Sequence, residues 1–437
     1  MAMIVKNNMA AKKALNQLDK NDKAMAKSLK KVASGMKINS AADDASGFSI
    51  SEKMRVQIQG LEQDVDNTQT GSSMLKVAEG GLQSSADILK TLKEKVINAA
   101  NDTNTDADRR TIQKELDQAI DQLDENANVS YNGKIMLDGS HNNEVLQPGT
   151  KTVLANESLS NDISSTMELT ELKDSTGRDL GIFADSKIEI SYVTKGKTHV
   201  SVLDPVEDTI LGKLFSSISN RGDVIMDFSA STVVGQDRVG QDVHTTSGEK
   251  ALLFSARNPG VDGQISGLTF NVINRDGTTN RTANSILNDF REAIRAENPS
   301  PDNALVFQIG TQSNQAVKIG FSDMRAVALG LKTSDGTTLD VTTQKKANAA
   351  ISVVDLAMQK VLDQQTTVGS MQSRLEYTAS NLTTAGENTQ SSESVIRDAN
   401  MAREMTEYTK NNVITQAAQS MLAQANQNSS QVLQLLQ

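Results

Sequence analysis

Two seven-residue repeats of apolar side chains, one near each end, limit most strongly what this chain can fold into. A strict seven-residue repeat keeps one apolar seam on the same side of a helix, so each repeat predicts a long helix that needs a partner helix. Each repeat is the other's most economical partner, which makes the two ends one structural unit and the middle an insertion. The predicted rod seam consists of Met54, Leu61, Thr68, Leu75, Leu82, Leu89 and Val96, then Val354, Val361, Val368, Leu375 and Leu382.

The composition favours long helices over one large globular core. The chain has 437 residues, no Cys, no Trp, nine Phe and four Tyr, and so few aromatic residues are typical of narrow helical seams. We therefore predict a mainly α fold at both termini, a long antiparallel helical rod, with an inserted α+β domain. The lack of Cys excludes a disulfide framework and a thiolate metal site. No apolar run approaches the ~20 residues of a membrane span, and Met1–Val5 is too short for a secretory signal.

The outermost segments carry amphipathic patterns but have no further core to join. Isolated helices of this kind are marginal in water. We therefore predict that residues 1–40 and 398–437 become ordered by burial against neighbouring copies, and identical copies that meet head to tail form an open helical polymer. The predicted assembly residues are Leu15, Leu18, Met25, Leu29, Val32, Met36, Met401, Met405, Ile414, Ala418, Met421, Ala425, Val432 and Leu435.

Turn and cap signals divide the helical zones. Asn39 and Ser40 are candidate caps for a first long helix over Ala45–Ala100, which would extend about 80 Å. Thr105 or Asp106 is expected to cap the next helix, and Asn132-Gly133 predicts a tight turn. In the second half the apolar spacing lapses over Ala385–Ser394, which indicates a joint between two helical segments.

The middle of the chain changes from helical to alternating patterns. A strand pair followed by an amphipathic helix occurs twice, with helices expected near Val206–Ile218 and Ala283–Glu297, and this suggests two related α+β units. The predicted strands are Lys187–Val193, Thr198–Leu203, Asp223–Phe228, Ala251–Ser255 and Leu268–Ile273.

The charge is unevenly distributed. The chain carries −10 overall, which disfavours nucleic acid as a partner. Residues 1–40 hold nine Lys against Asp19 and Asp22, which gives +7. A basic amino-terminal helix is compatible with contact to a membrane surface or nucleic acid, and equally with a solvated or intersubunit face.

No constellation of residues indicates catalysis, a metal or a cofactor. The three histidines, His141, His199 and His244, are far apart and lack the His-Glu-x-x-His pattern of a zinc peptidase. The neighbouring carboxylates Asp43 and Asp44 favour a turn or capping role. Gly260–Gly267 lacks the Lys-Ser/Thr of a phosphate loop. We therefore expect no enzyme activity and no cofactor.

Several segments resemble bacterial flagellin, the subunit of the flagellar filament. Ala33–Gly47 reads ASGMKINSAADDASG, similar to the family's SSGxRINSAxDDAAG. Tyr131–Ser140 (YNGKIMLDGS), Ile396–Asn412 and the tail Gln419–Gln427 (QSMLAQANQ) match further family motifs. Phe307–Leu331 resembles the segment that forms the family's β-hairpin. The resemblance covers roughly residues 1–140 and 302–437.

The resemblance implies three domains and a set of partners. Terminal helices 1–44 and 396–437 would form the inner filament core, 45–140 with 302–395 a helical rod with a β-hairpin near 307–331, and 141–301 a variable surface domain. The chain would self-polymerise into the extracellular filament for swimming and would be exported without a cleaved signal peptide. Its partners would be itself, an export chaperone on about Met401–Leu436, and filament cap and junction proteins.

The resemblance also implies a surface for a Toll-like innate receptor. The family pattern is approximately LQRVRELAV, whereas Leu89–Ile97 reads LKTLKEKVI. Thr91 and Lys95 replace an Arg and a Leu, and Thr cannot make the planar multi-donor contact of Arg. We therefore predict weakened receptor binding. The receptor-like surface consists of Leu89, Thr91, Lys93, Glu94, Lys95 and Glu115.

A hook–filament junction protein is the alternative interpretation, because it shares the terminal helices. The complete tail motif favours flagellin. A glycan-binding role for residues 141–301 also stays open.

Overall fold

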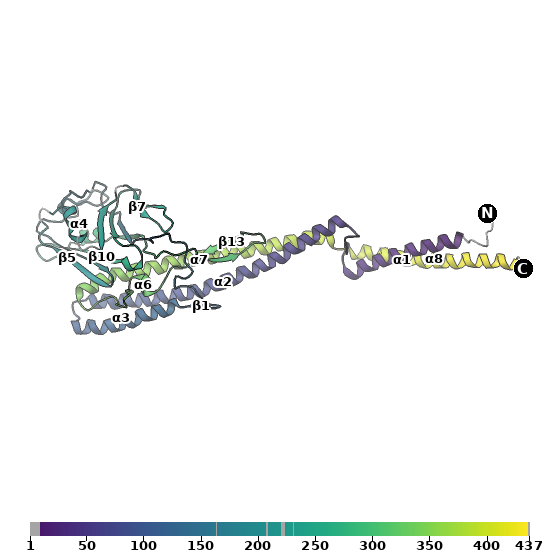
Figure 1. Ribbon diagram of the computed structural model, residues 1–437, viewed down its shortest axis with the longest axis horizontal. Helices are drawn as coiled ribbons and strands as arrows, with labels where there is room; N and C mark the ends of the chain where they lie inside the picture. The colour runs from purple at the N-terminus through teal and green to yellow at the C-terminus, as the bar shows by residue number, and fades with distance from the viewer. Residues whose placement is uncertain (1–8, 163, 207–208, 220–222, 230, 436–437) are drawn as a thin grey trace. The chain divides into compact units, whose positions relative to one another are not determined.

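A computed structural model describes the chain except residues 1–8, 163, 207–208, 220–222, 230 and 436–437 (Figure 1). It falls into two compact units. Unit one comprises residues 1–68, 308–315 and 377–437, and unit two comprises 69–307 and 316–376. The two longest helices therefore contribute to both units.

Long helices occupy both ends of the chain, as the seven-residue repeats predict. Two short 3-10 helices, η1 (Leu169–Glu171) and η2 (Val261–Gly263), lie in the central part of the chain. The helices are α1 (Met9–Ser34), α2 (Ala45–Ala100), α3 (Asp106–Ala127), α4 (Leu211–Ser219), α5 (Arg281–Leu287), α6 (Ala326–Leu329), α7 (Gln344–Arg397) and α8 (Met401–Leu435).

In unit two, α2, α3 and α7 run side by side (Figure 1). Gln365 Nε2 of α7 donates to Gln83 Oε1 of α2 at 3.0 Å, and Lys93 Nζ of α2 lies 2.6 Å from Asp355 Oδ1 of α7. Rising numbers on one helix meet falling numbers on the other, so α2 and α7 are antiparallel. The helix α3 returns along α2, where Asn126 Nδ2 donates to Ser84 Oγ. The antiparallel helical part of the predicted fold class is confirmed.

The ends of α3 follow from local sequence. Thr105 is its N-cap, with its side chain accepting from the Asp108 backbone N–H and the Asp108 carboxylate accepting from the Thr105 N–H. This reciprocal capping box confirms the Thr105 prediction. After α3, Asn132 and Gly133 have φ of 50° and 78°, which fits the tight turn of a two-residue hairpin.

The central part of the chain forms two larger antiparallel sheets, of order β10-β4-β5 and β11-β3-β9-β6. Smaller two-stranded sheets are β1-β2, β7-β8 and β12-β13. The strands are β1 (Ser130–Tyr131), β2 (Lys134–Ile135), β3 (Val153–Asn156), β4 (Lys187–Thr194), β5 (Lys197–Leu203), β6 (Val224–Phe228), β7 (Val233–Gln236), β8 (Asp242–His244), β9 (Leu252–Ala256), β10 (Ile265–Ile273), β11 (Arg291–Ile294), β12 (Leu305–Gln308) and β13 (Ala316–Ile319).

One hydrophobic core joins the two larger sheets with α4 and α5. Tyr192 of β4 and Phe254 of β9 are fully buried, and their rings meet edge to face at 5.5 Å. Leu214 of α4 and Leu287 of α5 belong to the same buried cluster. The inserted α+β part of the predicted fold class is thus confirmed.

Two predictions about the insertion are wrong. The second helix does not extend over Ala283–Glu297, because α5 ends at Leu287 and Arg291–Ile294 pairs with β3 instead. The side-chain amide of Asn288 accepts from the Phe270 N–H and donates to the Phe270 carbonyl, and these two bonds end the helix there. The two supposed strand–helix repeats do not match either, since β4 and β5 form a hairpin whereas β9 and β10 lie in different sheets.

The predicted joint at Ala385–Ser394 is also wrong. The helix α7 continues to Arg397, and the chain breaks only at residues 398–400. Hydroxyls of Thr383, Thr389 and Ser392 donate to the carbonyl four residues earlier. These hydroxyls find their hydrogen-bond acceptors within the helix itself, so the lack of apolar residues marks an exposed stretch of helix and not an interruption of it.

Candidate assembly surface

The terminal helices α1 and α8 of unit one pair antiparallel. Lys31 Nζ of α1 lies 3.3 Å from Glu404 Oε1 of α8, and Asn411 Nδ2 of α8 donates to Ser28 Oγ of α1 at 3.3 Å. Ser28 is buried, and Thr415 is its buried counterpart on α8. The pairing therefore includes buried polar side chains beside half-buried apolar ones such as Leu18 and Met25, and it covers only one face of each helix.

A compact joint links these two helices to the beginning of α2 and the end of α7 within unit one. Lys37 N–H donates to the Arg397 carbonyl at 2.7 Å, and Ala399 N–H donates to the Gly35 carbonyl at 2.9 Å. The Arg397 guanidinium is 8% exposed, lies 2.5 Å from Glu52 Oε1 and stacks over the Phe48 ring at 5.3 Å. Its hydrogen bond holds the pKa of the Glu52 carboxyl below its ordinary value.

Asp43 and Asp44 shape the turn before α2. The Asp44 carboxylate accepts from the Ser46 and Gly47 N–H groups at 3.1 and 3.0 Å, which caps α2 and confirms the capping prediction. Asn39 and Ser40 are not the caps; both donate to Asp43. Lys27 also bonds to Asp43 and lowers the pKa of that carboxyl.

The predicted assembly residues divide by exposure within the single chain. Val432 and Leu435 lie outside the part of the chain whose side chains the structure describes. Large apolar residues are exposed at Leu15 (54%), Leu29 (49%), Met401 (44%), Met405 (45%), Ile414 (38%) and Met421 (66%). Half-buried are Leu18, Met25, Val32, Met36, Ala418 and Ala425.

The predicted rod seam is mostly inaccessible to solvent. Met54 and Leu382, at the outer ends of the two repeats, are half-buried. The remaining members are at most 7% exposed: Leu61, Thr68, Leu75, Leu82, Leu89, Val96, Val354, Val361, Val368 and Leu375. Burial in one chain describes packing, and whether the seam also takes part in assembly stays a prediction.

The predicted receptor-like residues lie in unit two, but not all on the surface. Leu89 is fully buried, whereas Thr91, Glu94 and Glu115 are exposed. Lys95 Nζ lies 2.6 Å from Glu115 Oε2, so two of the predicted contact residues pair with each other. Lys93, half-buried, pairs with Asp355.

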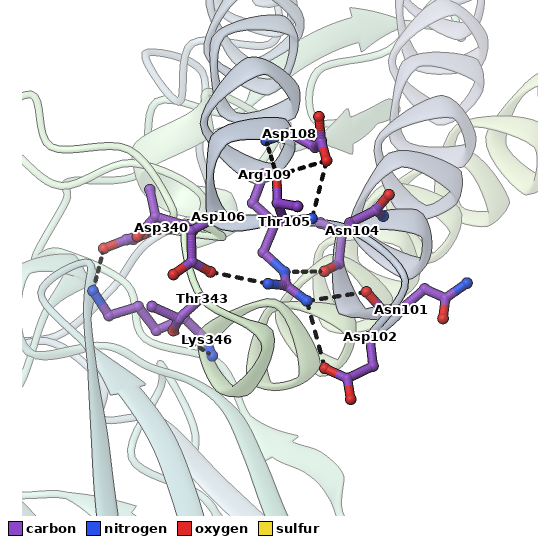
Figure 2. A network of polar contacts seen from close by, with 12 residues as sticks. Asn101, Asp102, Asn104, Thr105, Asp106, Asp108, Arg109, Asp340, Thr343 and Lys346 are labelled. Carbon is purple, nitrogen blue, oxygen red and sulfur yellow. Dashed lines mark hydrogen bonds and ion pairs between the residues drawn. The ribbon is translucent and has the colours of Figure 1, made fainter.

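Arg109, which was not predicted from the sequence, anchors the turn between α2 and α3 (Figure 2). Its side chain is 6% exposed. The guanidinium donates to the Ala99 and Asn101 carbonyls at 2.9 and 3.0 Å and to Asp106 Oδ1 at 2.9 Å. It thereby satisfies carbonyl groups that the end of α2 leaves free. An Arg three residues after an Asp at a helix start was the available signal.

A second missed cluster lies around Lys360 of α7 in unit two. Its Nζ is 3.4 Å from Glu292 Oε1 and 3.3 Å from the Ala328 carbonyl. With the oxygen and nitrogen of its side-chain amide exchanged, Gln264 accepts from the same Nζ and donates to the Ala328 carbonyl. Burial lowers the pKa of Lys360, and burial raises the pKa of nearby Glu297.

The histidines lie in separate settings. His141 Nδ1 is 3.3 Å from the Asn303 carbonyl, His244 Nδ1 is 3.1 Å from Thr232 Oγ1, and His199 stacks on Tyr192. Among the residues that the structure describes, no three His, Asp or Glu side chains gather as metal ligands. Within the same residues no helix is long and apolar enough to cross a bilayer.

Long helices at both ends and an inserted α+β region are the fold class of this chain. Residues 5–142 match the bacterial flagellin N-terminal helical region and residues 351–436 the bacterial flagellin C-terminal helical region. The chain is 34% identical to a flagellin of Clostridium tyrobutyricum over 427 residues, which cover 97% of this chain and 99% of that protein. It belongs to the bacterial flagellin family and is a structural subunit of the extracellular flagellar filament.

Solved structures show more distant similarity. FliC from Burkholderia pseudomallei is 19% identical with a TM-score of 0.27, covering 70% of this chain and 99% of that one. The flagellar junction protein FlgL from Legionella pneumophila is 15% identical with a TM-score of 0.29, covering 81% and 100%.

Proposed function

We propose that the exposed apolar residues of α1 and α8 are the contacts through which this subunit polymerises. The observation that carries the proposal is their exposure: Leu15, Leu29, Met405 and Met421 each leave 45–66% of their surface uncovered. Exposed apolar surface that becomes buried contributes roughly 25 cal/mol per Å². Neighbouring copies can supply that burial.

The contacts within the chain support this proposal. The pairing of α1 with α8 includes a half-buried ion pair between Lys31 and Glu404 and a hydrogen bond between Asn411 and Ser28. These polar contacts fix the register of the two helices and cover only the sides that face each other. Two helices that cover one face of each other leave their other faces available for a polymer.

Seeded growth tests the proposal. The full chain and a chain lacking residues 398–437 are incubated with short filament seeds and inspected by electron microscopy. We expect filaments from the full chain alone. Equal growth of the shortened chain would contradict a role for α8, and growth of neither would point to a subunit that needs a cap protein.

We also propose which part of the filament each range of residues forms. Residues 1–44 and 396–437 form the filament core, 45–140 and 302–395 the rod, and 141–301 the surface domain. Limited proteolysis of assembled filaments checks this division. Cleavage should concentrate within 141–301, and preferential cleavage within 1–44 would contradict it.

The proposal extends to the export of the subunit and to the proteins that bind its terminal helices. The subunit leaves the cell without a cleaved signal peptide, and an export chaperone binds α8 from Met401 onward, where Met401, Met405 and Met421 expose apolar surface before assembly. Filament cap and junction proteins bind the same terminal helices. Mass spectrometry of secreted protein should find an intact amino terminus apart from removal of Met1; loss of a longer segment would overturn this route.

We propose weakened recognition by the Toll-like innate receptor. The Lys95–Glu115 ion pair engages both side chains within the chain, so a receptor must break it, and Thr91 lacks a guanidinium. Receptor activation by the Thr91→Arg/Lys95→Leu variant should exceed that of the unmodified protein. Equal activation would refute the proposal.

The filament subunit is favoured over the alternative of a hook–filament junction protein, because a relative that matches nearly the full length of both chains is a flagellin. Copy number per cell checks this, since filament subunits are abundant and junction proteins scarce.

A further inference from the structure

Seven lysines of α1 lie on one side of the helix. At about 100° per residue, Lys12, Lys13, Lys20, Lys23, Lys27, Lys30 and Lys31 fall within an arc of about 100°. We call these residues the lysine stripe. The half-buried residues Ala14, Leu18, Met25 and Val32 lie about 150–170° from its centre. Apart from Lys31, which pairs with Glu404 of α8, the stripe therefore faces away from the side of α1 that α8 covers.

Most of the stripe is left without a counter-charge inside the chain. Six of the seven lysines are exposed, and Lys31 is half-buried. Lys23, Lys27 and Lys31 pair with Asp19, Asp43 and Glu404. Among the described residues, Lys12, Lys13, Lys20 and Lys30 form no ion pair. Like charges three or four positions apart destabilise a helix, so the stripe gains from an anionic partner.

The rest of the chain supplies a surface of the opposite sign. Since the whole chain carries −10 and residues 1–40 carry +7, residues 41–437 carry −17. In a polymer, every copy brings both the stripe and this acidic remainder into contact with its neighbours. Complementary charge fixes the register of an interface and speeds encounter.

We propose that the lysine stripe binds carboxylates of a neighbouring copy and sets how copies dock in the filament. This inference rests on the proposed polymerisation through the terminal helices, and adds a charged face to the apolar one. It predicts that assembly of this subunit depends on salt in a way that apolar burial alone does not.

The test compares two variants of equal net charge. The stripe variant is Lys12→Gln/Lys20→Gln/Lys30→Gln, and the matched control is Lys151→Gln/Lys173→Gln/Lys250→Gln, three exposed lysines outside the stripe. The critical concentration for seeded growth is measured at about 20 mM and about 500 mM NaCl, where the Debye length falls from roughly 20 Å to about 4 Å.

At low salt the stripe variant should need at least roughly threefold more protein than the control, and this difference should shrink at high salt. Equal critical concentrations of the two variants at low salt would overturn the inference while leaving polymerisation itself intact. Failure of the unmodified chain to grow on seeds at either salt concentration would instead overturn the proposed function. Binding to anionic phospholipid vesicles that the stripe variant alone loses, with unchanged growth, would assign the stripe to a membrane and also overturn the inference.

Cross-linking identifies the partner side chains. Filaments grown from a mixture of ¹⁴N- and ¹⁵N-labelled protein are treated with a carbodiimide, which joins a lysine amine to a carboxylate with loss of water. Mixed-isotope peptides that contain Lys12, Lys20 or Lys30 are expected. Their absence, when other mixed-isotope cross-links form, would contradict the inference.

Discussion

Arg397 and Arg109 illustrate how single buried cations fix helix ends in this chain. Each guanidinium is under a tenth exposed and bonds to a carboxylate on a neighbouring turn or helix. Arg109 additionally donates to backbone carbonyls at the end of α2 and in the turn that follows it. The spacing of Asp106 and Arg109 was a local signal for their ion pair, whereas the bond from Arg397 to Glu52 could not be predicted from spacing, because it joins segments that meet only after folding.

The Glu52 and Asp43 carboxyls make the joint of unit one sensitive to acid. Bonds from Arg397 and Lys27 lower the pKa of each carboxyl. A depressed folded-state pKa gives stability that is present above the ordinary value and is lost as the pH falls through the folded one. Hydrogen exchange of amides 35–48, corrected for its intrinsic pH dependence, should accelerate below about pH 4.

The Glu52→Gln/Asp43→Asn variant is the control for this prediction. Its exchange at the joint should be faster near neutral pH and should change less with acid. Protection of the unmodified joint that stays constant from pH 6 to pH 3 would refute the role of these two carboxyls.

Lys360 offers a second prediction for a single residue. Its side chain is 3% exposed and Glu292 is 9% exposed. The substitution Lys360→Met leaves Glu292 buried without its main cation and should lower the free energy of unfolding by about 3 kcal/mol. Adding Glu292→Gln should recover part of that loss in a denaturant titration. Additive losses would show that the two groups do not interact.

Among the elements, the long helices were predictable because apolar residues repeat every seven positions along the one side of each helix that is buried. The strands β4 and β6 were predicted to within a residue or two for a similar reason, since their burial largely alternates. The strand β5 was predicted to within one residue although its burial does not alternate. The end of α5 and the pairing of β9 and β10 were not, because Asn288 and the sheet order act through distant segments. Of the assembly surface, the sequence identified the apolar positions, and only the structure separated exposed Leu15 from half-buried Leu18.

Two adjacent glycines in α2 give a matched test of helix packing. A Cβ at Gly80 would meet no atom within 4 Å, whereas at Gly81 it would lie 3.0 Å from Leu137 Cδ1 and 3.3 Å from Val129 Cγ2. Gly80→Ala should raise the free energy of unfolding by about 0.5–1 kcal/mol. Gly81→Ala should gain less or lose stability. Equal gains in thermal unfolding would contradict the close packing at Gly81.

For the molecule as a whole, assembly must bring together copies that each carry −10. In the proposed assembly, apolar burial along α1 and α8 opposes this repulsion, and the separation of +7 from −17 along the chain reduces it. The terminal helices combine exposed apolar residues with the lysine stripe.

The critical concentration of seeded filament growth, measured for matched apolar variants, tests the central claim most directly. One variant is Leu15→Ser/Leu29→Ser/Met421→Ser, whose three side chains on the terminal helices are 49–66% exposed. The other is Phe183→Ser/Val202→Ser/Val239→Ser, whose three side chains in the insertion are 48–66% exposed. At about 1 kcal/mol for each half-exposed side chain, the first should raise the critical concentration roughly a hundredfold and the second hardly at all. Equal critical concentrations would contradict assembly through the terminal helices.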